Sequence, residues 1–311
     1  MSTHNIRAIR VHSYGDADQL KLEHIQRPEP QAGEVLIQVH AAGVNPMDWK
    51  IRRGYFKDVM PMHFPYIPGL ELAGVVVEVG PGVTAFQKGQ AVYGQSMQGT
   101  YAEYTVAGTD SLALQPQSLS FEEAATVPVG ATTAWQGLFD HGKLEAGQRV
   151  LIQGASGGVG LFAVQFARWK GAHVLATTSG ANVYFVRSLG AETVIDYTTT
   201  ALASVVHNVD LVFNTVGGSA PEDSLQVVKR GGTLVTIAGQ PTAEKAQERG
   251  VRATSFYTQV GSELLETFAR LIDEGQVKVA IEKVFPLSEA SQAHELSQQG
   301  HGRGRIVLHS A

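Results

Sequence analysis

The residues best suited to chemistry lie in one glycine-rich run, and they suit the binding of a dinucleotide. The run follows an apolar segment at 150–152 and precedes a helical pattern at 161–170. It consists of Gly154, Ala155, Ser156, Gly157, Gly158, Val159 and Gly160. A strand, a glycine turn and a helix start in this order let the backbone approach a pyrophosphate, which the first helical N–H groups face. A plain glycine-rich turn is the alternative, and the flanking strand and helix favour the dinucleotide site.

The second strand of this pattern bears on the choice of dinucleotide, because NAD-preferring sites usually place an acidic residue at its end. Here the strand ends at Thr178 and Ser179, and no Asp or Glu occurs between Glu145 and Glu192. A carboxylate would repel a 2′-phosphate, so its absence permits NADPH, and the two hydroxyls can donate hydrogen bonds to that phosphate. Alternatively, these two residues only finish a strand.

Three further runs end later strands, and their position points to the same crevice. They are residues 214–218 with Val216, residues 237–240 with Ile237, Ala238 and Gly239, and the aromatic pair Phe256 and Tyr257. Ordinary turns are the alternative for the glycine-containing runs, and core contacts are the alternative for the aromatic pair.

Composition narrows the class of protein. The chain has 311 residues, of which 43% are hydrophobic and 17% charged, with a net charge of −5 and no cysteine. This size suits one large or two ordinary domains, and no basic field is present for nucleic acid. Without cysteine there is no disulfide, thiolate nucleophile or thiolate metal ligand. Residues 1–15 lack the apolar core of a secretory signal and no segment approaches membrane-spanning length, so we expect a cytoplasmic enzyme.

Two patterns of expected secondary structure follow one another along the chain. Residues 6–120 hold short β-rich segments separated by Gly and Pro, which indicates a small, largely antiparallel unit. Its expected strands are 6–12, 34–39, 72–79, 91–93 and 101–106. From residue 121 strands alternate with helices such as 161–170 and 182–189, and the expected strands are 150–153, 173–178, 193–196, 210–215, 233–238 and 254–257. Six strands in this order predict a doubly wound parallel sheet.

The tail of the chain is too short to form a domain of its own. It contains an expected helix at 263–274, a strand at 277–284, a helix at 287–299 and a strand at 305–309. We expect the tail to return to the first unit. The predicted domains are therefore residues 1–120 together with 262–311, and an inserted nucleotide domain at 121–261.

Together with residues 42–48, these motifs resemble the zinc-free branch of the medium-chain dehydrogenase/reductase superfamily, in particular NADPH:quinone oxidoreductases and enone reductases. Similar stretches occur almost from end to end, at 69–74, 99–106, 128–134, the glycine run and 303–308. The resemblance implies an α/β fold in which a GroES-like, β-rich catalytic domain is split around a Rossmann domain.

The resemblance also bears on zinc. Zinc-dependent relatives use a Cys and a Gly-His-Glu motif as metal ligands, where this chain has Asn45 and Gly69-Leu70-Glu71. Without a thiolate, and with Leu70 in place of the imidazole, a catalytic zinc site of this type cannot be assembled. The implied reaction is metal-free hydride transfer from NADPH to a small apolar quinone or α,β-unsaturated carbonyl.

Four residues are candidates for the polar chemistry of this transfer. Lys50 stands where similar enone reductases carry Lys, and its ammonium can hold the cofactor or stabilise an enolate oxygen; a solvated lysine is the alternative. Asn45 resembles the active-site Asn of the family, which can bond nicotinamide or substrate. Asp48 either orients Lys50 or caps the following turn, and Tyr55 is a candidate proton donor.

The resemblance adds two cofactor contacts and one departure. Thr133 matches a family Thr near the nicotinamide, and Tyr197 matches a contact to the 2′-phosphate. Quinone reductases often carry Lys where this chain has Asn182, which is uncharged. Arg303 is the candidate for the missing cation, with a solvated arginine as the alternative.

Two functions from different classes remain. The first is an NADPH-dependent reductase of quinones or enones, and the second is a non-catalytic NADPH-binding sensor or structural protein. A short-chain dehydrogenase is excluded because no tyrosine has Lys four residues later. The resemblance also implies a homodimer joined through the edge strand at 254–257.

Overall fold

The computed structural model describes residues 5–239, 243–300 and 302–310, which divide into two compact units. The first unit comprises Met1–Val129, Val260–Glu274 and Val279–Ala311, and the second comprises Gly130–Gln259 and Gly275–Lys278. The sequence predicts the corresponding boundaries at 120/121 and 261/262.

The second unit is built on a six-stranded sheet in which every pair of neighbours is parallel. In spatial order the strands are Thr193–Asp196 (β10), His173–Thr178 (β9), Arg149–Gln153 (β8), Val209–Asn214 (β11), Val228–Thr236 (β12) and Arg252–Ser255 (β13). From β8 the chain adds β9 and β10 on one side of the sheet. It then crosses to β11 and adds β12 and β13 on the other side. This confirms the predicted doubly wound sheet, whose order reverses between β8 and β11.

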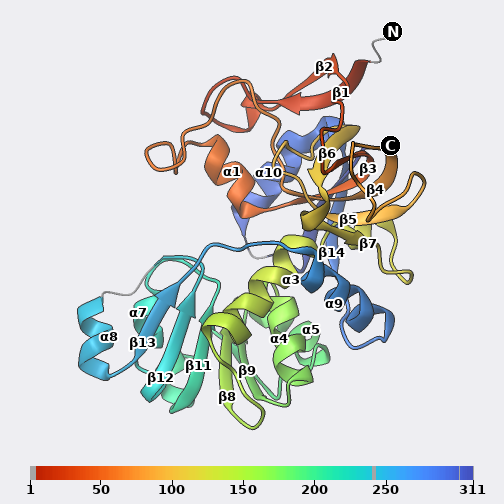
Figure 1. Ribbon diagram of the computed structural model, residues 1–311. Helices are drawn as coiled ribbons and strands as arrows, with labels where there is room; N and C mark the ends of the chain where they lie inside the picture. Colours follow the sequence, from red (N-terminus) through yellow and green to blue (C-terminus); the bar gives the residue numbers. More distant parts are fainter. Residues whose placement is uncertain (1–4, 240–242, 301, 311) are drawn as a thin grey trace. The chain divides into compact units, whose positions relative to one another are not determined.

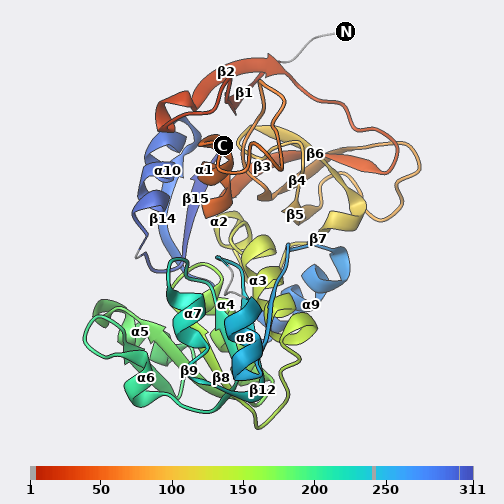
Figure 2. The same ribbon diagram turned by 90° about the vertical axis from the view of Figure 1, so that its left-hand side faces the viewer.

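Helices cover both faces of this sheet, as Figure 1 and Figure 2 show. The two directions of travel, combined with right-handed crossovers, place the helices of the two halves on opposite faces. The helices are Gly160–Trp169 (α4), Val183–Ser188 (α5), Leu202–Val205 (α6), Ala220–Ser224 (α7) and Ala243–Arg249 (α8). Helix Pro128–Trp135 (α3) and a π-helical turn at Gln136–His141 lead into β8. Strands covered on both faces read as continuous apolar runs, which explains why the sequence indicated them.

The first unit is built on a seven-stranded sheet and a separate hairpin. In spatial order the sheet contains Ile281–Pro286 (β14), Arg305–His309 (β15), Glu34–Val44 (β3), Glu71–Val79 (β4), Ala91–Gln95 (β5) and Leu112–Leu114 (β7), while Tyr104–Gly108 (β6) also pairs with β3. The hairpin consists of Asn5–Arg10 (β1) and Lys21–Gln26 (β2). Except for the parallel pair β14–β15, the pairings are antiparallel. The last strand of the chain, β15, thus pairs with β3, so the N-terminal and C-terminal parts of the chain share one sheet.

The α-helices in the described residues of the first unit are Pro46–Arg52 (α1), Phe121–Ala124 (α2), Ser262–Asp273 (α9) and Ala290–Gln299 (α10). Helix α9 buries Leu265, Phe268, Leu271 and Ile272, a spacing that gives a helix one apolar face. Helix α1 lies beside α10 (Figure 1), so the C-terminal part of the chain supports the helix that carries Lys50.

Several element bounds differ from the sequence prediction. The edge strand expected at 254–257 is β13 at Arg252–Ser255, and the strand expected at 277–284 is β14 at Ile281–Pro286. Strand β2 and helices α1, α7 and α8 were not predicted. Strand β2 is mostly exposed and polar, and α1, α7 and α8 are short, so none shows a strong apolar period.

The centre of the first sheet leaves no room for a side chain at Gly74. A Cβ there would lie against the carbonyl oxygen of Gln38 and 2.9 Å from Ile37 Cγ2. We predict that Gly74→Ala lowers the free energy of unfolding by about 1–3 kcal/mol because it overpacks a rigid sheet. Urea unfolding followed by circular dichroism measures the loss. Gly217→Ala is the control, since nothing lies within 4 Å of its Cβ position; equal losses for the two variants would contradict the packing argument.

Candidate functional site

The glycine run forms the turn between β8 and α4, in the second unit. Gly154 adopts a φ of +73°, which favours glycine, and a Cβ there would lie 2.9 Å from Val216 Cγ2. A Cβ on Gly160 would meet Ala155 Cα at 2.7 Å. Gly157 instead has an open Cβ position, whose nearest atom is Gly154 O at 3.4 Å. Two glycines of the run are therefore needed for local packing, and Gly157 leaves the backbone accessible to a ligand.

The strand ends on both sides of β8 hold polar groups that have no protein partner. Thr178 Oγ1 at the end of β9 and Asn214 Nδ2 at the end of β11 are buried without a hydrogen bond. Buried polar groups are costly unless they are paired. A ligand that carries hydroxyl and phosphate groups would satisfy them, so the residues present fit a dinucleotide.

Asn182 joins the glycine run to the end of the second strand. Its Nδ2 lies 3.4 Å from both Ser156 Oγ and Ser179 Oγ. The main-chain N–H of Tyr197 donates to Thr178 O at 3.2 Å, which brings the half-exposed Tyr197 beside this strand end. Asn182, which the sequence presented only as a missing charge, thus lies near the predicted residues Ser156 and Ser179, while Tyr197 lies beside Thr178.

Most of the other predicted cofactor residues occupy neighbouring strand ends, while Thr133 lies in α3. Val216 N donates to Asn214 Oδ1 at 2.6 Å, and Ile237 N donates to Asn214 O at 3.1 Å. Ala238 follows β12, its N–H bound to Thr236 Oγ1, and Gly239 adopts a φ of +79°. The hydroxyl of Thr133 lies 2.7 Å from that of Thr258. The run predicted at 237–240 extends to Gln240, which lies outside the described residues.

In the first unit, helix α1 carries the predicted polar residues. Lys50 Nζ lies 5.5 Å from the centre of the Trp49 ring, within the range of a cation–π contact. The Tyr55 ring is 62% exposed and meets Trp49 edge-on at 5.8 Å. Trp49 Nε1 is buried and has no hydrogen-bond partner. Arg303 is an exposed residue of the same unit.

Asp48 makes no hydrogen bond to Lys50 and instead acts as a buried cap. Its Oδ2 accepts the main-chain N–H of Asn45 at 2.8 Å and the hydroxyl of Tyr101 at 2.9 Å. Tyr101 lies 3.2 Å from His294 Nε2, and Arg52 Nε donates to His294 Nδ1 at 3.3 Å. Since Nδ1 accepts, Nε2 carries the ring proton and donates to Tyr101. The bonds form a directed chain from Arg52 to Asp48 that ties α1 to α10.

Burial moves the pKa values in this chain in opposite directions. It raises the pKa of Asp48 to about 6, although hydrogen bonds from Asn45 and Tyr101 oppose the shift. It lowers the pKa of His294 to about 3, and the positive charge of Arg52 acts in the same direction. Both groups are therefore neutral near pH 5.

Sequence reasoning missed four buried partners: Glu71, Tyr101, His294 and Arg305. Glu71 binds Asn45 Nδ2 at 2.8 Å and forms an ion pair with Arg305. Burial lowers the pKa of Arg305 to about 10, and the charge of Asp48 opposes this shift. The available signal was an Arg inside an apolar terminal strand, since buried charges are nearly always paired.

Among residues 5–239, 243–300 and 302–310, no group of three or more His, Asp or Glu side chains could hold a metal ion. The helices within this part of the chain are all too short or too polar to cross a bilayer.

Two family models match the chain. The model described as alcohol dehydrogenase GroES-like domain matches residues 31–134, and the one described as zinc-binding dehydrogenase matches residues 189–308. The first match confirms the GroES-like part of the predicted fold class.

Curated and solved proteins resemble the chain over nearly its whole length. It is 34% identical over 323 residues to a chloroplast envelope quinone oxidoreductase homolog of Arabidopsis thaliana, covering 97% of this chain and 98% of that protein. It is 34% identical over 310 residues to a chloroplastic NADPH-dependent alkenal/one oxidoreductase of the same plant, covering 95% and 77%. The solved quinone oxidoreductase from Coxiella burnetii superposes with a TM-score of 0.90 at 33% identity, covering 99% of this chain and 100% of that one.

The buried chain from Arg52 to Asp48 predicts two opposite dependences of stability on pH. The pKa of Asp48 rises from 3.8 to about 6 on folding, so the folded state holds an extra proton between these values. This group's contribution therefore falls as pH rises through that window, by about 3 kcal/mol at about 1.4 kcal/mol per pKa unit. For His294, whose pKa falls from 6.5 to about 3, the unfolded state holds the extra proton, so its contribution rises with pH.

Single variants separate the two effects. Asp48→Asn keeps an oxygen acceptor but cannot ionise, so its free energy of unfolding should rise more steeply from pH 4 to 6 than that of the parent. His294→Gln should shift the slope in the opposite direction. Urea unfolding at pH steps across this window measures both, and parallel curves for Asp48→Asn and the parent would contradict the raised pKa of Asp48.

Proposed function

We propose that this chain, which belongs to the zinc-free branch of the medium-chain dehydrogenase/reductase superfamily, is an NADPH-dependent reductase of quinones or α,β-unsaturated carbonyls. The observation that carries the proposal is the glycine turn before α4, flanked by the unpaired groups of Thr178 and Asn214. The relatives named quinone oxidoreductase and NADPH-dependent alkenal/one oxidoreductase support the same activity.

We assign NADPH to the second unit. The residues that would hold its pyrophosphate are those of the glycine run, and Thr178, Ser179 and Tyr197 would hold the adenosine end. Val216, residues 237–239 and Thr133 would line the rest of the site. The chemistry that the cofactor supplies when bound is a hydride for an electrophilic carbon.

Lys50 and Asn45 would act on the substrate side. Negative charge develops on the carbonyl oxygen as hydride reaches a conjugated carbonyl, and a donor already in place lowers the barrier. The ammonium of Lys50 and the amide of Asn45 supply such donors. The carboxylate of Asp48 already accepts hydrogen bonds from the main-chain N–H of Asn45 and from Tyr101. We therefore propose that it orients Asn45 rather than transferring a proton. The exposed Tyr55 is the remaining proton-donor candidate.

We propose that the reaction needs no zinc. Asn45 and Glu71 bind each other, and Glu71 also neutralises Arg305, so neither side chain is available as a metal ligand without loss of these bonds. Chelators should therefore leave activity unchanged.

The oligomeric state and the compartment are also proposals. Among the residues that the structure describes, strand β13 ends the parallel sheet with one edge unpaired, which suits pairing with a second copy into a homodimer. Sedimentation as a monomer would contradict this. Some relatives are named chloroplastic, so the family does not fix a compartment. We propose the cytoplasm, and cell fractionation tests it.

The first test is turnover. Purified protein with NADPH and a panel of quinones and enones should consume NADPH, as followed by the absorbance of reduced nicotinamide. Lys50→Ala should lower kcat about 100-fold, because an electrostatic contact at the developing charge is lost. Lys57→Ala is the matched control on a neighbouring exposed lysine. Tight NADPH binding without turnover on any substrate would instead support the non-catalytic binding protein.

The second test is cofactor choice. Ser179→Asp places a carboxylate at the strand end, so repulsion of the 2′-phosphate should weaken NADPH binding about tenfold and leave NADH binding nearly unchanged. Ser179→Ala separates the loss of a hydroxyl from the added charge. Fluorescence titration with each dinucleotide measures both affinities, and equal effects on the two would place the 2′-phosphate elsewhere.

A further inference from the structure

The carboxylate of Glu71 is the buried centre of a group of contacts around Asn45. Its Oε1 accepts Asn45 Nδ2 at 2.8 Å, and its Oε2 accepts the main-chain N–H of Val129 at 2.8 Å. Arg305 forms an ion pair with Oε1, and the two side chains are 3% and 0% exposed. Each carboxylate oxygen therefore has a donor, and the charge has a counter-ion.

The chemistry of Glu71 determines which way the Asn45 amide faces. An ionised carboxylate only accepts hydrogen bonds, so the end of the amide that meets it must be the NH₂ group. The carbonyl oxygen Oδ1 is then turned away from Glu71. A neutral partner with both donor and acceptor atoms would permit either orientation of the amide.

The strand register of the first sheet brings Glu71 and Arg305 together. Gly43 of β3 pairs with Glu71 on one side and with Val307 on the other. A Cβ on Gly43 would collide with the Glu71 carboxylate and lie 2.6 Å from Ala125 O. A glycine at this position therefore gives the carboxylate its space, and β15 brings Arg305 to it from the end of the chain.

We propose that Glu71 is a positioning residue for hydride transfer, which fixes the amide of Asn45 in one orientation, and that Arg305 supplies the counter-charge that holds the Glu71 carboxylate in place. The proposal rests on the proposed function, in which Asn45 bonds the reactants. Glu71 itself touches neither substrate nor cofactor in this role and acts through Asn45.

The test removes the orienting charge without leaving a buried ion. Glu71→Gln alone leaves the buried charge of Arg305 without a counter-ion, so this variant can fail to fold. The double variant Glu71→Gln/Arg305→Met removes both charges at similar volume. We expect it to retain the parent circular dichroism spectrum and to lower kcat about 10- to 100-fold, the scale of a misplaced reacting group.

A cycle with Asn45→Ala distinguishes positioning from a general structural role. If Glu71 acts through Asn45, the double change should alter kcat less than about twofold once Asn45 is Ala, because the effects are coupled. A purely structural role would lower kcat by the same factor in both backgrounds, which would overturn the proposal.

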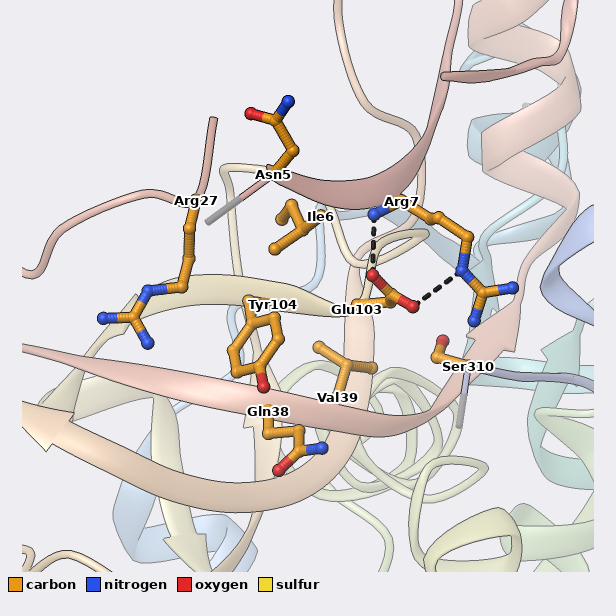
Figure 3. Close-up of a pocket in the computed structure, with 9 residues that line it drawn as sticks. All are labelled: Asn5, Ile6, Arg7, Arg27, Gln38, Val39, Glu103, Tyr104 and Ser310. Carbon is orange, nitrogen blue, oxygen red and sulfur yellow. Dashed lines mark hydrogen bonds and ion pairs between the residues drawn. The ribbon is translucent and has the colours of Figure 1, made fainter. Parts of the chain in front are cut away.

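An exposed ion pair in the same unit supplies the matched control. Arg7 and Glu103 line a surface pocket of about 390 Å³ and bind each other through Nε and Oε1 at 2.7 Å (Figure 3). Arg7→Met/Glu103→Gln removes the same two charges and should leave kcat unchanged. A loss equal to that of the buried pair would overturn the assignment to Glu71.

The remaining outcomes separate this proposal from the proposed function. If the parent turns over quinones or enones and Asn45→Ala is fully active, the positioning role is overturned and the reductase activity stands. If the parent shows no turnover with any substrate of the panel, both are overturned.

Discussion

The free-energy cost of burying the charged carboxylate of Glu71 constrains the fold of the first unit. An isolated buried carboxylate is strongly unfavourable, and one that loses its partner costs about 3–5 kcal/mol. Glu71 is compatible with the fold only because Arg305, Asn45 and Val129 meet it. These partners come from β15, the start of α1 and the first turn of α3, so one charge requires the correct register of widely separated segments. This requirement fixes the register of the segments at one position. Apolar packing is less demanding, because it tolerates exchange of similar residues.

Some of the buried polar groups without a partner lie near the residues assigned to ligands in each unit. In the second unit they are Thr178 Oγ1 and Asn214 Nδ2, on either side of the glycine turn. In the first unit Trp49 Nε1 is unpaired beside Lys50. These groups are buried without a hydrogen bond, which costs free energy in the folded protein. A polar ligand that bonds to them would remove this cost.

The sequence predicted the parallel sheet well because its evidence was local. Strands β8, β9 and β11 are buried runs of apolar residues, and the turn before α4 carries its glycines in sequence. The contacts of Asn45 were not predictable in this way. Its partners Glu71 and Arg305 are brought to it by strand register, which no local pattern encodes. The sequence assigned Glu71 to a lost metal motif and chose Arg303 as the useful cation, two positions from the buried Arg305.

The same contacts give a physical basis for the predicted independence from zinc. Asn45 and Glu71 lie where zinc-dependent relatives have a Cys and the Glu of a Gly-His-Glu motif. A metal that took Glu71 as a ligand would compete with Arg305, Asn45 and Val129 for the two carboxylate oxygens. It would also free the amide of Asn45 to rotate. The ion pair and the amide thus form one alternative to a metal centre, in which hydrogen bonds rather than coordination hold the polar side chain in place. Conversion of such a site to zinc binding would need new ligands at 45 and 70.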